Sequence, residues 1–178
     1  MLVEGLPHDL DAAVLAVIHV PPHSPGRLVE ILQRRTTLRV AWAQDAGAIE
    51  AGHVYIAPPD HHLIVEEGRM RLTRAAPEHH NRPAIDPLFR SAAQVYGPRA
   101  IAVVLSGRLD DGTTGLHAVS ELGGTTVVQD PDDALHPDMP RNALVATTVD
   151  HVAPASELGE LLGRLVAESP DEVAPNSV

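Results

Sequence analysis

Two short apolar runs constrain the fold of this chain more than any other feature. Residues 12–18 read AAVLAVI and residues 100–105 read AIAVVL, and neither run contains a polar side chain. Runs of this length are typical of strands that are covered on both faces, as the strands of parallel sheets are. Segments with helical spacing of apolar residues also occur, at residues 86–96 and 157–166. This alternation predicts an α/β fold, with a doubly wound, mostly parallel sheet flanked by helices.

Local signals add detail to this prediction. Residues 62–65 and 70–73 are separated by a Glu-Gly pair, which predicts an antiparallel hairpin. Asp86 precedes a proline at the start of an expected helix and is a candidate N-cap. We expect residues 1–167 to form one domain and residues 168–178, which have the composition of a tail, to be disordered.

The charge and the composition exclude several classes of function. The formal net charge of −11 makes a surface that repels phosphate groups, so we expect no nucleic-acid partner. The chain has no cysteine, which excludes thiol catalysis and Cys-based zinc sites. No apolar run approaches the roughly 20 residues that span a bilayer, and the first residues lack a basic region. We therefore expect a cytoplasmic protein without membrane insertion.

Polar side chains follow the predicted strands at the points where the strands end. His19 comes directly after the first apolar run, Ser106, Asp110 and Asp111 follow the second, and Gln129 follows a later strand. Ligands of open α/β sheets bind at the carboxyl edge, where these side chains meet if the strands are parallel. His19 beside Asp111 would form two parts of a nucleophilic triad, with the carboxylate orienting the imidazole. Two simpler interpretations stay open: His19 is an ordinary loop residue, and the aspartates cap the following helix.

Paired histidines raise the question of a metal site. The chain has 11 histidines, and among them are the pairs His61-His62 and His79-His80. Neither pair has the spacing that places two ligands on one face of a helix, and both pairs are expected in loops. We therefore predict solvated histidine side chains, no metal site and no cofactor.

Six stretches of the sequence, in order, resemble the catalytic domain of the CheB-type protein-glutamate methylesterases. They are VIHVPP (17–22), GHVYIAPPDHHL (52–63), NRPAIDPLFRSAA (81–93), VVLSGRLDDGTTGL (103–116), GGTTVVQDPDDALHPDMPRNA (123–143) and VDHVAP (149–154). The resemblance covers residues 12–166. It implies hydrolysis of γ-glutamyl methyl esters on chemoreceptors or on other methyl-esterified proteins, with release of methanol. It also implies a Ser-His-Asp mechanism without a cofactor.

The resemblance assigns roles to particular positions. The family's histidine corresponds to His19 and its aspartate to Asp111. The family's Thr-Gly-Met-Gly-x-Asp-Gly loop corresponds to residues 106–112, so the oxyanion and substrate loop would include Ser106, Gly107, Arg108 and Gly112. Arg108 stands where the family usually has Met, and Leu109 stands where it usually has Gly.

The nucleophile that the resemblance implies is missing from this chain. In the family it is the Ser of a Gly-Ala-Ser-x-Gly-Gly loop after the first strand, and no such loop occurs here. Counting back from His19, residues 12–18 are the second strand, so we expect the first strand and its Ser to precede Met1. Two alternatives remain. One is a catalytically inactive module that binds a methylated or acidic helix. The other is a metal hydrolase that uses His61, His62, His79 or His80. The oligomeric state is not predicted.

Overall fold

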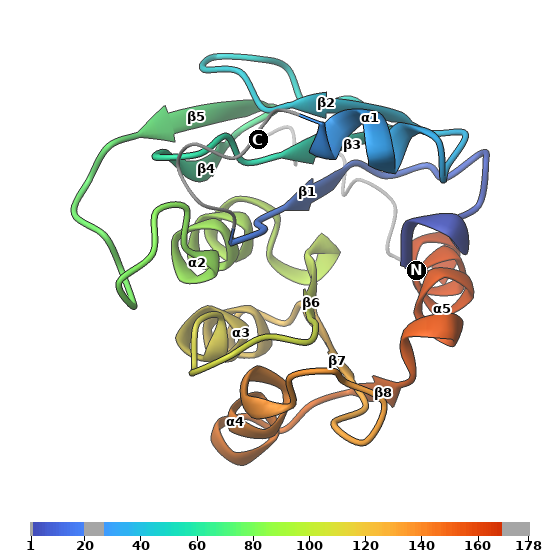
Figure 1. Ribbon diagram of the computed structural model, residues 1–178, viewed down its shortest axis with the longest axis vertical. Coiled ribbons are helices and arrows are strands. Elements are labelled where there is room, and N and C mark those ends of the chain that lie inside the picture. The colour runs from blue at the N-terminus through green and yellow to red at the C-terminus, as the bar shows by residue number, and fades with distance from the viewer. Residues whose placement is uncertain (1, 20–26, 169–178) are drawn as a thin grey trace, which may run out of the picture.

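The computed structural model describes residues 2–19 and 27–168 of the chain (Figure 1). The strands are β1 (Val14–Ala16), β2 (Arg39–Trp42), β3 (His53–Ile56), β4 (His62–Glu66), β5 (Arg69–Thr73), β6 (Ile101–Val104), β7 (Thr125–Gln129) and β8 (His151–Ala153). The helices are α1 (Leu28–Gln33), α2 (Ile85–Tyr96), α3 (Thr113–Glu121), α4 (Asp138–Ala146) and α5 (Ala155–Glu168), with short 3-10 helices η1 (Leu2–Glu4) and η2 (Gly97–Arg99). This alternation of strands and helices confirms the predicted α/β class.

The parallel strands form two three-stranded sheets, in the orders β1-β3-β2 and β6-β7-β8. Val14 pairs with Val54 in the first sheet, and Val104 pairs with Val128 in the second. The remaining strands, β4 and β5, form the predicted antiparallel hairpin. All strands within each of the two three-stranded sheets are parallel. The loops that follow β1, β3, β6 and β7 therefore emerge at the carboxyl edges of these sheets, where ligands of parallel sheets bind.

β1 and β6 are the edge strands where the two sheets come together. In the described part of the chain, β1 forms a ladder only with β3, and β6 only with β7. β1 lies between β3 and β6 in Figure 1. All residues of β1 are partly exposed, as are Ile101 and Val103 of β6, which is less burial than the apolar runs predict. Each of these two strands therefore has backbone N–H and C=O groups without a ladder partner on one side.

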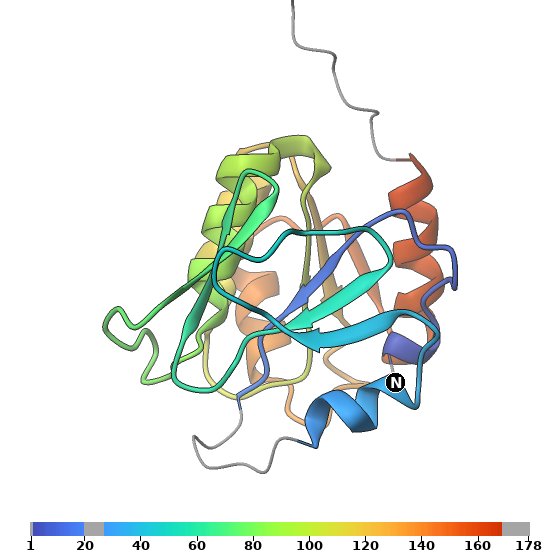
Figure 2. The same cartoon turned by 90° about the horizontal axis from the view of Figure 1, so that it is seen from above.

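Hydrophobic cores lie on both faces of the sheets. Tyr55 and Val104 point into the core that α2, α3 and α4 cover. Val54 and Val103 point in the opposite direction, into the core that α1 and α5 cover. The alternation follows from the period of two along a strand. Figures 1 and 2 show α5 on the side of the molecule away from α2 and α3. The two-sided cover agrees with the predicted doubly wound arrangement.

The start of α2 and the end of α5 differ from the sequence-based predictions. The prediction that Asp86 is the N-cap of α2 is wrong, because Ala84 occupies that position and Asp86 lies in the first turn. α5 extends to Glu168, and the rest of the expected tail, residues 169–178, lies outside the described residues. Of the helices that the structure describes, none combines the length and the apolar character needed to cross a bilayer.

Candidate active site

His19 and Asp111 form a hydrogen-bonded pair at the junction of the two sheets. His19 follows β1, Asp111 precedes α3, and the His19 Nε2 atom lies 2.8 Å from Asp111 Oδ2. The Asp111 side chain is 1% exposed, whereas the His19 side chain is 30% exposed. A buried carboxylate thus holds an imidazole that solvent and ligands can reach. The structure brings these two predicted residues together.

The first turn of α2 also holds Asp111. The backbone N–H of Ile85 donates to both carboxylate oxygens, at 2.8 and 3.0 Å, and the backbone N–H of Asp86 donates to Oδ1 at 3.2 Å. N–H groups at the start of a helix lack partners within the helix, so the Asp111 carboxylate satisfies two of them. The expectation that Asp110 or Asp111 caps the following helix is wrong. The N-cap residue of α3 is Gly112, without a side-chain hydrogen bond.

Opposing influences act on the pKa of Asp111. Burial raises this pKa. The hydrogen bond from His19 and those from the Ile85 and Asp86 backbone together lower it by more than burial raises it. The result is a pKa below the ordinary value of 3.8. Asp111 is therefore ionised at neutral pH and can accept a hydrogen bond from the His19 ring.

The loop between β6 and α3 contains the four residues expected to shape the oxyanion site. The backbone N–H of Ser106 donates to Gln129 Oε1, and that of Gly107 donates to the His136 carbonyl, each at 2.9 Å. These two N–H groups are therefore already used. The backbone N–H of Arg108 has no hydrogen-bond partner within residues 2–19 and 27–168. Arg108 therefore keeps a donor that a ligand could use.

Gly112 is required at its position for a conformational and a steric reason. Its φ is 92°, in the left-handed region that side chains rarely adopt. A Cβ atom there would also lie 2.9 Å from Ile85 Cγ2. The close approach of Gly112 to Ile85 is what lets the neighbouring Asp111 reach the N-terminus of α2.

Gln129 fixes the loop from the neighbouring strand. Its Oε1 accepts from Ser106, and its Nε2 donates to Asp133 Oδ2 at 2.7 Å. Asp133 in turn accepts from the backbone N–H of Ala155, at the start of α5, at 2.8 Å. These bonds connect the loop between β6 and α3, called the site loop below, to the start of α5 through the side chains of Gln129 and Asp133. The sequence places Gln129 at the same edge of the sheet, but this bracing role was not predicted.

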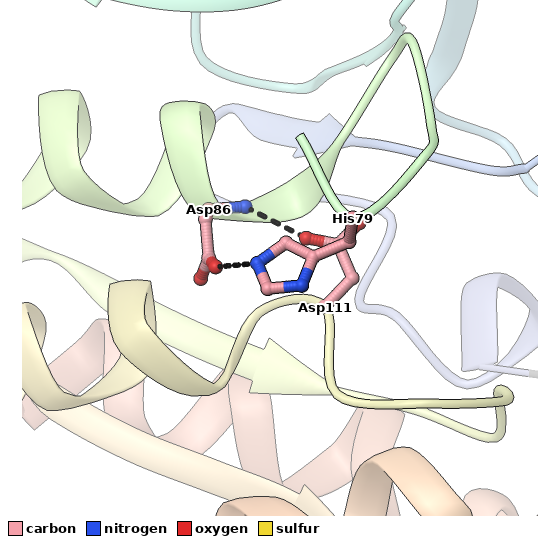
Figure 3. Close-up of side chains that lie close together, drawn as sticks. All are labelled: His79, Asp86 and Asp111. Carbon is pink, nitrogen blue, oxygen red and sulfur yellow. Dashed lines mark hydrogen bonds and ion pairs between the residues drawn. The ribbon is translucent and has the colours of Figure 1, made fainter. Parts of the chain in front are cut away.

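A second His–Asp pair, which the sequence did not predict, lies beside Asp111 (Figure 3). His79 Nε2 lies 2.8 Å from Asp86 Oδ2, and His79 Nδ1 lies 3.2 Å from Asp110 Oδ1. Burial lowers the pKa of His79, but the hydrogen bond and charge of Asp86, with the charges of Asp111 and Asp110, raise it above 6.5 overall. Burial raises the pKa of Asp86 as well. Since several carboxylates surround His79, we place the shared proton on the imidazole.

The predicted solvation of the paired histidines holds for only some of them. It is wrong for His79 and for His62, which is buried in β4. His62 Nδ1 accepts from the Ala84 backbone N–H at 3.2 Å, and His62 Nε2 lies 3.1 Å from the Ala76 carbonyl. His80 is exposed, as predicted. His62 therefore joins the hairpin to the segment before α2, which is a structural role.

No serine hydroxyl is hydrogen-bonded to His19 in the described ranges 2–19 and 27–168. Ser91 donates to the Pro87 and Leu88 carbonyls of its own helix, and its Oγ accepts from Val65. Ser106 Oγ accepts from the His136 backbone at 2.9 Å. Ser24 lies outside the described residues. Ser91 and Ser106 are therefore used in structural contacts rather than aimed at the imidazole.

Comparison with known proteins places this chain in a family. The family model described as CheB methylesterase matches residues 1–162, and the chain belongs to the CheB methylesterase family. The crystal structure of the Thermotoga maritima CheB methylesterase catalytic domain is similar, with a TM-score of 0.88 and 32% sequence identity. The match covers 92% of this chain and 89% of that domain.

Similar curated proteins also carry the name of this family's activity. A protein-glutamate methylesterase/protein-glutamine glutaminase of Nocardioides sp. is 37% identical over 177 residues, and one of Methanosarcina mazei is 32% identical over 173 residues. This chain spans 48% and 47% of their respective lengths. A relative from Leptospira interrogans is 36% identical over 165 residues, which are 92% of this chain and 86% of that protein.

Proposed function

We propose that this chain provides the His–Asp part of a protein-glutamate methylesterase, which hydrolyses γ-glutamyl methyl esters and releases methanol. The observation that carries the proposal is the contact of 2.8 Å between His19 and the buried Asp111 carboxylate. Membership of the CheB methylesterase family and the printed names of the relatives support the choice of ester. The substrate would be a methyl-esterified chemoreceptor or another methylated protein of the cytoplasm.

The geometry assigns the two nitrogen atoms of His19 different tasks. Asp111 accepts a hydrogen bond from Nε2, so the proton lies on that atom and Nδ1 keeps its lone pair. Nδ1 would take the proton of an attacking hydroxyl and later deliver it to the departing methoxide. Asp111 fixes the tautomer and stabilises the imidazolium that forms in between. The backbone N–H of Arg108, which has no partner within the described residues, is the candidate donor to the oxyanion.

We further propose that the attacking serine belongs to a strand that pairs with both β1 and β6. Each of these strands lacks a ladder partner on one side in the described part of the chain, and their partly exposed side chains support the same placement. A parallel strand between them would end at the same edge as His19 and the loop before α3. A serine directly after such a strand would therefore arrive next to the His–Asp pair.

The alternative function is a binding module that recognises a methylated or acidic helix without hydrolysing it. The observation that favours this alternative is that no serine contacts His19 in residues 2–19 and 27–168. In this case His19 and Asp111 would only shape the surface that the partner meets.

One assay separates the two functions. The protein is purified from the cells that produce it and mixed with a receptor that carries radiolabelled methyl esters, and released methanol is counted. We expect release by the wild-type protein, a loss of about 10²- to 10⁴-fold in His19→Gln, and no change in the exposed control His80→Gln. Binding of the methylated receptor without any release of methanol would overturn the esterase proposal and support the binding module.

A further inference from the structure

His79, Asp86 and Asp111 come from three different segments and meet in one cluster (Figure 3). One ligand atom of each residue lies within 4.8 Å of the others. His79 comes from the loop before α2, Asp86 from the first turn of α2, and Asp111 from the loop before α3. In Figure 3 the His79 ring points toward the Asp86 carboxylate, and the Asp111 carboxylate accepts from the Asp86 backbone N–H beside it. Imidazole nitrogen and carboxylate oxygen are both ligand types that Zn²⁺ binds in proteins.

The two carboxylates differ in how many hydrogen bonds they accept. A carboxylate has about four lone-pair positions. Within residues 2–19 and 27–168, Asp86 receives donors only from Gly115, at Oδ1, and His79, at Oδ2. Asp111 receives donors from His19, Ile85 and Asp86, of which Ile85 is shared between the two oxygens. Backbone N–H donors thus hold both groups in place. Asp86 keeps lone pairs for a cation, whereas an ion at Asp111 would take the place of the long contact of 3.2 Å from the Asp86 N–H.

The charge and burial of the cluster favour a cation. Asp86 and Asp111 are each 1% exposed, and burial of two neighbouring carboxylates is costly unless positive charge lies close by. In the described part of the chain, the basic side chains that bond to these carboxylates are His79 and His19, and no arginine bonds to either of them. The His79 side chain is 26% exposed, which leaves a route for an ion and for water molecules that would complete its coordination.

We propose that His79, Asp86 and Asp111 form a binding site for one divalent transition-metal ion of the Zn²⁺ class. The imidazole nitrogen favours Zn²⁺, Co²⁺ or Ni²⁺ over Mg²⁺ and Ca²⁺, which prefer all-oxygen sites. The ion replaces the proton between His79 and Asp86, and the ligand atoms draw together from their spacing of up to 4.8 Å. The bound ion joins the loop before α2 to the N-termini of α2 and α3. This inference does not rest on the proposed esterase function.

The test is binding of Co²⁺ to the full chain after removal of metals with a chelator. Titration calorimetry gives the number of sites, and the visible absorption of Co²⁺ reports a nitrogen and oxygen ligand set. We expect one site in the wild-type protein. We expect binding at least about 100-fold weaker in His79→Gln, and unchanged binding in the exposed neighbour control His80→Gln. Mg²⁺ at the same concentration should not compete.

Two controls distinguish loss of this site from unfolding of the variant and from binding of Co²⁺ to other histidines. His79→Gln keeps the loop's size, and its unfolding midpoint in chelator shows whether the variant folds. A second variant, Asp86→Asn, keeps the shape of the carboxylate and should also weaken Co²⁺ binding. Equal binding by wild type and a folded His79→Gln would overturn the proposal, because the ion would then reside on other histidines. Absence of any Co²⁺ binding by the wild-type protein would overturn it as well.

Discussion

The Asp111 carboxylate holds His19 at 2.8 Å although 92 residues separate the two along the chain. The same carboxylate accepts hydrogen bonds from the first N–H groups of α2. Asp111 therefore joins the end of β1, the start of α2 and the loop before α3. A site of this kind depends on the packing of the domain, because each of its contacts comes from a different part of the sequence.

The first prediction concerns this joining role. Asp111→Asn keeps the size of the side chain but removes its charge and one of its acceptor oxygens. We expect the free energy of unfolding to fall by about 1–3 kcal/mol, because buried N–H groups lose their acceptor. Urea denaturation at pH 7 in the presence of a chelator measures the change. Asp110→Asn, at an exposed neighbouring position, should change stability by less than about 1 kcal/mol. Equal losses in the two variants would contradict the account.

The second prediction concerns the brace between Gln129 and the site loop. Gln129→Leu is similar in volume but cannot accept from Ser106 or donate to Asp133. We expect a loss of about 1–3 kcal/mol in the free energy of unfolding, since the Ser106 N–H is left without its acceptor. Hydrogen exchange at the Ser106 amide should become faster than in the wild-type protein. Unchanged protection of that amide would show that Gln129 does not hold the loop.

The third prediction concerns the close approach of Gly107 to α4. A Cβ atom at position 107 would lie 2.1 Å from Met139 Sδ, so the buried methionine must move. We expect Gly107→Ala to cost about 1–3 kcal/mol of stability through overpacking. Introduced into Met139→Ala, the same substitution should cost clearly less, because the smaller side chain leaves space. Additive effects in the double variant would exclude the steric explanation.

The fourth prediction is a pH dependence. The backbone N–H of Ala155 and the side chain of Gln129 donate to Asp133 and hold its pKa below 3.8. A carboxylate whose pKa is lowered by folding stabilises the protein above its unfolded pKa of about 3.9, and this contribution disappears as the pH falls through the folded value. Asp133→Asn removes the titrating group.

Urea midpoints between pH 7 and pH 3 check this dependence. The wild-type protein should be more stable than Asp133→Asn at pH 7, and the difference should shrink below about pH 4. Asp132→Asn is the matched control, because the Asp132 side chain makes no hydrogen bond within the described residues. A difference between wild type and Asp133→Asn that stays constant down to pH 3 would contradict the assigned cause.

Local patterns predicted the framework of the site. The apolar runs at residues 12–18 and 100–105 contain β1 and β6, because strands covered on both faces leave a recognisable run of apolar side chains. The rule that ligands bind at the carboxyl edge then placed His19 near Asp111, which the structure confirms geometrically. Both predictions depend only on the apolar residues of a strand and on the polar residues that directly follow it in the sequence.

Contacts between distant loops could not be predicted in this way. Asp86 has the local pattern of an N-cap, but Ala84 takes that position and Asp86 instead accepts from Gly115 of α3. This contact requires the close packing of α2 and α3, where a Cβ at Gly115 would lie 2.5 Å from Phe89 Cβ. The pairing of His79 with Asp86 depends likewise on how the loop before α2 folds back. Neither arrangement has a signature in residue spacing.

Labelling with a fluorophosphonate probe tests whether His19 and Asp111 activate a serine. The protein is purified from its own cells, treated with the probe, and examined by intact mass and peptide mapping. We expect one serine adduct, on a segment that lies outside the described residues, with labelling lost in His19→Gln and retained in His80→Gln. A wild-type protein that acquires no adduct, or a His19→Gln variant that is labelled as fast as wild type, would contradict this expectation.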